Sequence, residues 1–283
     1  MNRIRLVALS LFFIAALLVP NYAQETNPYQ KQENDVQLKG KLEVVEDADL
    51  IDKLMLTLPG FSRDARSSLT EQSVRNFMMP PRTLGKRGSN ISYTLAACLE
   101  FYTNFGRNYK VNLSPDYISL SIPKQTSDIV WKDGFRFLAD NGTVSAAIMP
   151  FDAAAISTGV YATEKYTIDN FLQILKADLP KRQKAFEVRK ALMRGNPVMI
   201  ELEASEAFAK IEGQKQWEPD NEDGTSVTYP LIVVSFDQSR EAFEVFNPWS
   251  PTWGMNGYMW MHYNDFGKHV QRGYVMVPTT RVF

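Results

Sequence analysis

The sequence predicts an α+β fold in which helices come first and strands follow. Between residues 90 and 141 the apolar side chains recur at helical spacing. After Pro197 they form short runs, rich in β-branched and aromatic residues, that are typical of strands. The region from about residue 74 to the end is long enough for one domain with a substantial apolar core.

Helix boundaries follow from caps and turn residues. Ser114 followed by Pro115 is a cap with a favourable first-turn residue, and Gly195 is expected to end a helix. The predicted helices are Asp47–Leu58, Asn90–Thr103, a helix opened by Leu113-Ser114-Pro115, Asp128–Asn141, Ile168–Leu175 and Arg182–Arg194. The predicted strands are Val198–Ala204, Tyr229–Phe236, Glu241–Phe246 and Gly257–Tyr263.

Composition excludes several classes of protein and site. The net charge is −1 with dispersed basic residues, so nucleic acid is not an expected partner. The single cysteine, Cys98, allows no internal disulfide. The acidic segment 217–224 lacks the full ligand pattern of a calcium loop, and we expect no metal and no cofactor.

The N-terminus predicts export. Arg3 and Arg5 precede an apolar run from Leu6 to Val19, which is shorter than the ~20 residues that span a bilayer. Residues 1–23 are therefore predicted to be a signal peptide cleaved after Ala23, with an uncleaved anchor as the alternative. The mature protein is expected to be secreted or periplasmic, not membrane-bound, and a bacterial source suits export without disulfides.

Two motifs carry the most functional information. Arg87-Gly88-Ser89-Asn90-Ile91 precedes an apolar helix that contains Glu100. Residues 245–260 read VFNPWSPTWGMNGYMW, in which Asn247, Trp249 and the Trp253-Gly254 pair are followed by a Gly-Tyr dipeptide. A single buried tryptophan is ordinary in a core, but core packing does not explain why six residues of these types occur at these spacings.

Together these motifs resemble the papain-like (C1) cysteine peptidases, whose reactive cysteine opens a long helix within C-G-[SA]-C-[WY]. The resemblance implies a two-lobed fold: a helical lobe and an antiparallel β-barrel lobe, with a cleft between them. It places residues 74–283 in the peptidase domain and residues 24–73 in an N-terminal linker and packing arm, the alternative being a short pro-segment. It also implies the catalytic positions: Asn90 replaces the cysteine, Tyr229 the histidine and Leu84 the oxyanion glutamine, while Asn247 and Trp249 are retained.

These replacements predict the loss of thiol-based catalysis. An asparagine amide is a poor nucleophile and serves well as a helix N-cap, which is the role expected for Asn90. A tyrosine with a pKa near ~10 is almost fully protonated at neutral pH and makes a poor base. Leu84 has no donor for an oxyanion, and one missing donor costs roughly 10²–10³ in rate.

No substitute constellation is evident. Cys98 lies about two turns into its helix among apolar neighbours, so an inert buried thiol is expected. Ser89 corresponds to a family serine that points away from the reacting bond. His262 and His269 fall at no catalytic position of the family.

The sequence therefore predicts a secreted papain-like pseudopeptidase that binds a peptide or partner-protein segment in a cleft formed by Ser89, Asn90, Tyr229, Asn247 and Trp249. The alternative is an active hydrolase or peptidase homologue with a non-standard constellation such as Ser89 with Tyr229. Arg82, Lys86 and Arg87 also leave open an anion site beside the start of the helix, against a solvated basic turn.

Overall fold

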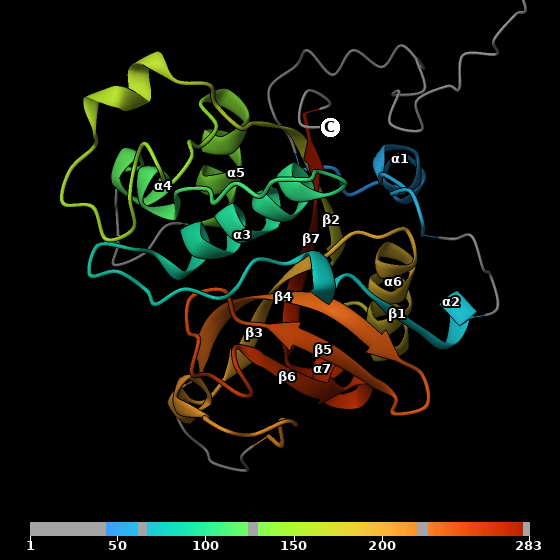
Figure 1. Ribbon diagram of the computed structural model, residues 1–283. Helices are drawn as coiled ribbons and strands as arrows, with labels where there is room; N and C mark the ends of the chain where they lie inside the picture. The colour runs from blue at the N-terminus through green and yellow to red at the C-terminus, as the bar shows by residue number, and fades with distance from the viewer. Residues whose placement is uncertain (1–43, 62–66, 124–129, 220–225, 280–283) are drawn as a thin grey trace, which may run out of the picture.

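The computed structural model describes residues 44–61, 67–123, 130–219 and 226–279 (Figure 1). Its α-helices are α1 (Ala48–Leu54), α2 (Ser67–Thr70), α3 (Asn90–Asn104), α4 (Pro115–Ser121), α5 (Trp131–Asp140), α6 (Lys181–Met193) and α7 (Tyr263–His269). Three short 3₁₀ turns are η1 (Arg75–Phe77), η2 (Thr158–Ala162) and η3 (Glu206–Lys210).

The strands form one seven-stranded antiparallel sheet. They are β1 (Glu71–Ser73), β2 (Ile168–Leu175), β3 (Val198–Ala204), β4 (Val227–Asp237), β5 (Ala242–Phe246), β6 (Tyr258–His262) and β7 (Val270–Pro278). Their order is β2-β7-β3-β4-β5-β6, and β1 pairs with β4 beside this path. The expected α+β fold, with helices and antiparallel strands in separate lobes, is confirmed.

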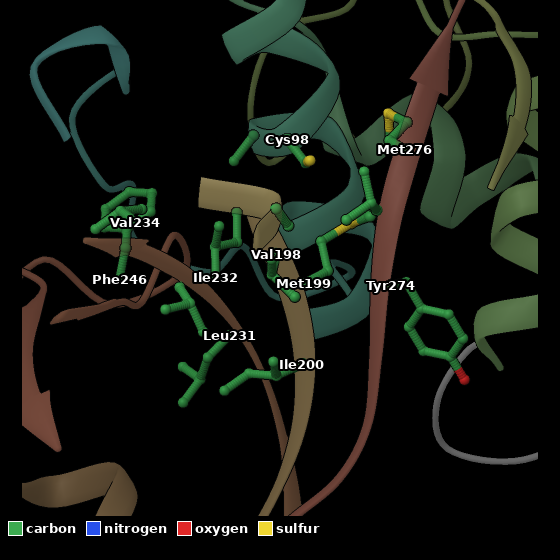
Figure 2. Close-up of a cluster of buried hydrophobic side chains, with 14 of the residues drawn as sticks. Cys98, Val198, Met199, Ile200, Leu231, Ile232, Val234, Phe246, Tyr274 and Met276 are labelled. Atoms are coloured by element: carbon green, nitrogen blue, oxygen red, sulfur yellow. The ribbon is translucent and has the colours of Figure 1, made fainter. Parts of the chain in front are cut away.

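Helix α3 lies between the two lobes (Figure 1). On one side it packs against α4 and α5, which together with α3 make up the helical lobe. On the other side it contacts β3, β4 and β7 of the sheet lobe, which also holds α6 and α7. Nearly all of its side chains are consequently buried, including Cys98 among Val198, Met199 and Met276 (Figure 2).

One predicted helix is wrong. Ile168–Leu175 is strand β2, whose apolar residues fit a helical period but are buried on both faces of the sheet. It pairs along its length with β7, a strand that the sequence analysis did not identify. The pairing partners of this segment lie about a hundred positions away in the chain. Their contacts decide in favour of a strand, although the local spacing of apolar residues suits a helix.

The other predicted helices are present among the described residues, but α1 ends at Leu54 and not at Leu58. Asp47 caps α1 by accepting a hydrogen bond from the Leu50 amide, and Ser114 caps α4. The predicted Asp128–Asn141 helix is α5, which begins at Trp131, and residues 128–129 lie outside the described part. Helix α6 ends before Gly195, whose φ of 85° is in the left-handed region that glycine tolerates.

The predicted signal peptide, residues 1–23, lies outside the described residues and stays a prediction. Among the residues that are described, no helix has the length and apolar character to cross a membrane. The described chain starts with residues 44–61, here called the N-terminal arm. Five of its apolar side chains belong to the main core, those of Val45, Ile51, Met55, Leu58 and Phe61.

Candidate functional site

Asn90 is the first residue of α3, and Ser89 is its N-cap. Ser89 has extended backbone angles, and its hydroxyl accepts a hydrogen bond from the Ser92 amide in a capping box. The expected capping role of Asn90 is therefore wrong by one position, because a cap needs the extended backbone that only Ser89 has. The Asn90 side-chain oxygen is left without a hydrogen-bond partner among the described residues.

The carbonyl oxygen of Pro230 connects α3 to the sheet lobe. It accepts a hydrogen bond from the Thr94 hydroxyl at 3.1 Å, one turn after Asn90, and another from Trp249 Nε1 at 2.9 Å. The Thr94 hydroxyl also reaches the Asn90 carbonyl oxygen at 2.9 Å. These bonds bring the start of α3, the residue after Tyr229, and Trp249 to one place, where the resemblance also put them.

Tyr229 is buried in an aromatic group on β4. Its ring lies 5.0 Å from that of Phe208 and nearly parallel to Trp249, and its hydroxyl donates to the Ser205 carbonyl oxygen at 3.0 Å. Burial raises the pKa of the Tyr229 phenol, and the negative charge of Glu206 adds to the rise. A protonated phenol that already donates to a backbone carbonyl is unsuited to accept a proton from a nucleophile.

Asn247 holds the loop that carries Trp249. It is fully buried, its backbone N–H donates to Gly257 at 2.8 Å, and its side-chain oxygen accepts from the Trp249 amide at 3.1 Å. This bond fixes the amide orientation, since only the oxygen can accept from an N–H. The side-chain nitrogen has no partner among the described residues. Asn247 thus orders the tryptophan loop.

Leu84 lies beside the same loop. Its backbone N–H donates to the Trp249 carbonyl oxygen at 3.1 Å, and the neighbouring Arg82 N–H donates to Pro248 at 3.0 Å. The Leu84 side chain packs on Gly88, where an added Cβ would come within 2.9 Å of Leu84 Cδ1. The resemblance singled out Leu84, Asn90, Tyr229, Asn247 and Trp249. Each of these residues, or a residue close to it in the chain, is hydrogen-bonded to another member of the group or to a chain neighbour of one, and Ser89 precedes Asn90.

A polar group that the sequence analysis missed supports the turn after Leu84. The Tyr93 hydroxyl accepts from the Gly85 amide, and the Asp152 carboxylate accepts from the Lys86 amide at 3.0 Å. Buried Asp116 accepts from the Asp152 amide at 2.9 Å. Burial raises the pKa of Asp116. No local pattern links these residues, because they come from three separate segments.

Arg82, one of the three basic residues of the anion-site hypothesis, is paired with a carboxylate of the protein itself. The Arg82 guanidinium bonds both carboxylate oxygens of Glu100 at 2.6 Å and Asn112 Oδ1 at 3.0 Å. Glu100 is fully buried and also accepts from the Leu113 amide at 2.6 Å. Arg82 therefore neutralises a buried carboxylate, while Lys86 and Arg87 are exposed on the turn.

The other candidate reactive side chains are those of Cys98, which is buried, and of the two histidines, which form hydrogen bonds away from Asn90. Cys98 is completely buried, and burial raises the pKa of its thiol far above the usual range. His262 bonds Gln216, and His269 contacts the Glu203 carbonyl oxygen. No cluster of three metal-ligating side chains occurs among the described residues.

Two surface cavities lie away from these positions. The first, of about 420 Å³, is lined by Lys110, Val111, Asn112, Ser145, Ala146 and Ala147. The second, of about 250 Å³, is lined by Ser121, Ile122, Pro123, Asp133, Arg136, Phe137, Asp140 and Asn141. Neither is lined by Asn90, Tyr229 or Trp249.

Comparison with known proteins gives a consistent fold. Residues 123–277 match the family described as papain family cysteine protease, a range that holds Tyr229, Asn247 and Trp249 but not Asn90 or Leu84. A comparison with curated proteins gave no match.

Solved structures of cysteine proteases superpose on the chain at low sequence identity. The proform of the ragweed pollen allergen Amb a 11 gives a TM-score of 0.60 at 14% identity, over 74% of this chain and 65% of that one. Xylellain from Xylella fastidiosa gives 0.57 at 15% identity, over 85% and 96%. Procathepsin L 3 of the Tenebrio molitor larval midgut gives 0.60 at 17% identity, over 84% and 75%. At these identities the likeness establishes the fold.

Proposed function

Because the chain belongs to the papain family of cysteine proteases, we propose that it is an exported pseudopeptidase, which keeps the family scaffold and binds a peptide without cleaving it. The residues at the matched catalytic positions support the loss of catalysis. Asn90 has no ionisable proton near neutral pH, and the Tyr229 hydroxyl donates to the Ser205 carbonyl oxygen. The Leu84 side chain has no hydrogen-bond donor for an oxyanion.

The observation that carries the proposal is the state of the only thiol. Cys98 lies about two turns along α3 from Asn90, and its exposed fraction is zero. Its neighbours in space are apolar side chains of β3 and β7, and burial raises the pKa of the thiol. A nucleophilic cysteine requires a thiolate that substrate can reach, and Cys98 offers neither.

Binding is supported by polar groups that remain at the matched positions. The Asn90 side-chain oxygen is without a partner, and it lies at the N-terminus of a fifteen-residue helix. That oxygen is buried, so an extended peptide could donate a backbone N–H to it only after the Asn90 side chain turns toward solvent; backbone pairing of this kind gives affinity with little demand on sequence. The competing proposal is a structural role through another face, which is favoured by the burial of the Tyr229 and Trp249 rings.

The non-standard hydrolase has weaker support. Ser89 is 3% exposed and its hydroxyl caps α3 through the Ser92 amide, while the Tyr229 hydroxyl donates to the Ser205 carbonyl oxygen. A serine nucleophile needs a base that accepts its proton, and the hydrogen bonds of both side chains serve the backbone instead.

The test uses the protein from residue 24 onward, a broad library of peptide substrates and a thiol-directed probe. We expect no turnover above buffer and no labelling of folded protein. Turnover that disappears in a Cys98→Ala variant, or covalent labelling at Cys98, would contradict the proposal. Turnover that survives Cys98→Ala but disappears in Ser89→Ala would favour the hydrolase.

A second experiment separates binding from a structural role. A library of linear peptides is selected on the immobilised protein, and selected peptides are titrated against three variants. We expect Asn90→Ala and Trp249→Ala to weaken binding at least tenfold. Phe186→Ala, at an exposed position on α6, should leave it unchanged. Equal affinity for all three folded variants would rule out binding at Asn90.

A further inference from the structure

The N-terminal arm, residues 44–61, is built into both lobes. On the sheet lobe, Val45 forms a parallel bridge with Leu172, and its carbonyl oxygen accepts from the Gln173 amide at 3.0 Å. This contact lies along the free side of β2, which is an edge strand of the sheet. An uncovered edge strand exposes unpaired backbone groups, so the arm completes the sheet at this point.

Polar contacts fix the arm to the end of α6. Asp52 pairs with Lys190 at 3.0 Å and with Arg194 at 3.7 Å, and its carbonyl oxygen accepts from Arg194 Nη1 at 2.9 Å. The Leu58 amide donates to the Arg194 carbonyl oxygen at 2.9 Å. Apolar packing adds to these bonds, because a Cβ at Gly195 would come within 2.6 Å of the Phe61 ring.

The same arm reaches the helical lobe through one buried amide. Asn196 donates to the Leu56 carbonyl oxygen at 2.7 Å and accepts from the Tyr102 hydroxyl of α3 at 2.9 Å. Both Asn196 and Tyr102 are fully buried. The Phe61 ring lies 6.1 Å from Phe105, directly after the end of α3. The arm thus contacts both lobes at the same end of this helix.

This attachment lies far from the candidate site. Asn90 and Asn104 are the first and last residues of α3, and a helix of that length extends roughly 20 Å. Tyr102 and Phe105 are therefore at the end remote from Asn90. The arm can tie the lobes together there without covering the matched catalytic positions.

We infer that the N-terminal arm is a permanent brace between the two lobes, and that it stays in the mature protein. The fold depends on three kinds of contact made by the arm: its core side chains, its bridge to the edge strand β2, and the hydrogen bonds of Asn196 to Leu56 and Tyr102. Any maturation cleavage then falls before Val44. This inference does not depend on whether the protein binds peptides.

The main experiment inserts a recognition sequence for a site-specific protease between Phe61 and Ser67 of the full chain. After cleavage, the fragment that ends at Phe61 should remain bound through gel filtration. When it is removed by denaturant and dialysis, the remaining chain should fail to regain a cooperative thermal transition. Adding the fragment back should restore the transition in a concentration-dependent way.

A remaining chain that refolds alone, with its Tm within a few degrees of the uncut protein, would overturn the inference. Sequencing the N-terminus of protein exported by its native cells gives an independent result. A mature chain that begins at or before Val44 supports the brace, and one that begins after Val44 contradicts it.

A pair of glycine variants tests the packing in the intact chain. Gly195 and Gly213 both have positive φ, 85° and 70°, but only Gly195 has atoms within 4 Å of an added Cβ. We expect Gly195→Ala to lower the Tm by roughly 10 °C, and Gly213→Ala by only a few degrees. Equal shifts would show that the Phe61 contact is dispensable.

Discussion

The Thr94 hydroxyl donates a hydrogen bond to the Pro230 carbonyl oxygen at 3.1 Å and joins the helix that begins at Asn90 to the strand that contains Tyr229. The two residues are 136 positions apart in the chain. Trp249 Nε1 donates to the same oxygen, so three separate segments meet there. The positions that resemble a catalytic site adjoin because of this buried carbonyl.

The first prediction concerns this bond. Thr94→Val keeps the shape of the side chain but removes the donor, and should lower the free energy of unfolding by about 1–2 kcal/mol. Thr103→Val is the matched control, since Thr103 is equally buried on α3 but bonds only the Leu99 carbonyl oxygen in its own helix. Denaturant unfolding should show a clearly smaller loss for the control.

The shared acceptor also predicts coupling. Trp249→Phe removes the second donor, and the double variant should differ from the sum of the single variants by more than about 0.5 kcal/mol. Additive losses would mean that the two donors stabilise the fold independently.

The second prediction concerns Arg82 and Glu100. Arg82→Met leaves a buried carboxylate without its counterion and should cost about 3–5 kcal/mol at neutral pH. Arg136→Met removes an exposed pair with Asp133 and should cost less than about 1 kcal/mol. Chemical unfolding of both variants measures the difference.

The pH dependence of that loss has a defined sign. Burial raises the pKa of Glu100, and the charge and hydrogen bonds of Arg82 oppose the rise. Without Arg82 the folded-state pKa rises further, so the folded variant binds a proton more readily than the unfolded chain. The loss should therefore be smallest near the unfolded pKa of about 4.3 and grow as pH increases toward 7. A loss that is constant with pH would contradict this account of Glu100.

The third prediction uses Cys98 as a probe of unfolding. Because the thiol is completely buried with a raised pKa, alkylation in native buffer should require opening of the core. The free energy from its alkylation rate should equal that from denaturant unfolding. Rapid alkylation of folded protein would mean that α3 opens locally beside β3.

Much of the fold could be predicted because its signals are local. Ser114-Pro115 marks the start of α4, and Gly195 follows α6 with the backbone angle that ends a helix. Strand β2 could not be predicted in the same way, since its apolar spacing suits a helix and only its pairing with β7 makes it a strand. The cap of α3 was misplaced by one residue because serine and asparagine cap helices about equally well.

In the candidate site, too, the features that follow a motif could be predicted, and those that depend on distant contacts could not. The resemblance placed Asn90, Tyr229 and Trp249 together, and in the structure Thr94 of α3 and Trp249 both bond the carbonyl oxygen of Pro230, the residue after Tyr229. The support around Leu84 was not predictable, because Asp116 and Asp152 carry no motif and act through backbone amides. The burial of the Tyr229 ring also depends on packing against Phe208, a residue outside both motifs.

The central claim, that Asn90, Tyr229 and Leu84 occupy a catalytic frame without its chemistry, is tested by restoring that chemistry. The variant combines Asn90→Cys, Tyr229→His and Leu84→Gln, and the rate of alkylation at position 90 is measured against pH. Pro230 has no backbone N–H and follows position 229, so full peptidase activity is not expected. The single variant Asn90→Cys is the control.

We predict that the new thiol in the triple variant titrates at least about one unit below the free value of ~8.5, because an adjacent imidazole and the N-terminus of α3 stabilise the thiolate. The single variant, which lacks the imidazole, should titrate closer to the free value. A thiol that titrates near ~8.5 in the folded triple variant, with no difference from the single variant, would contradict the claim.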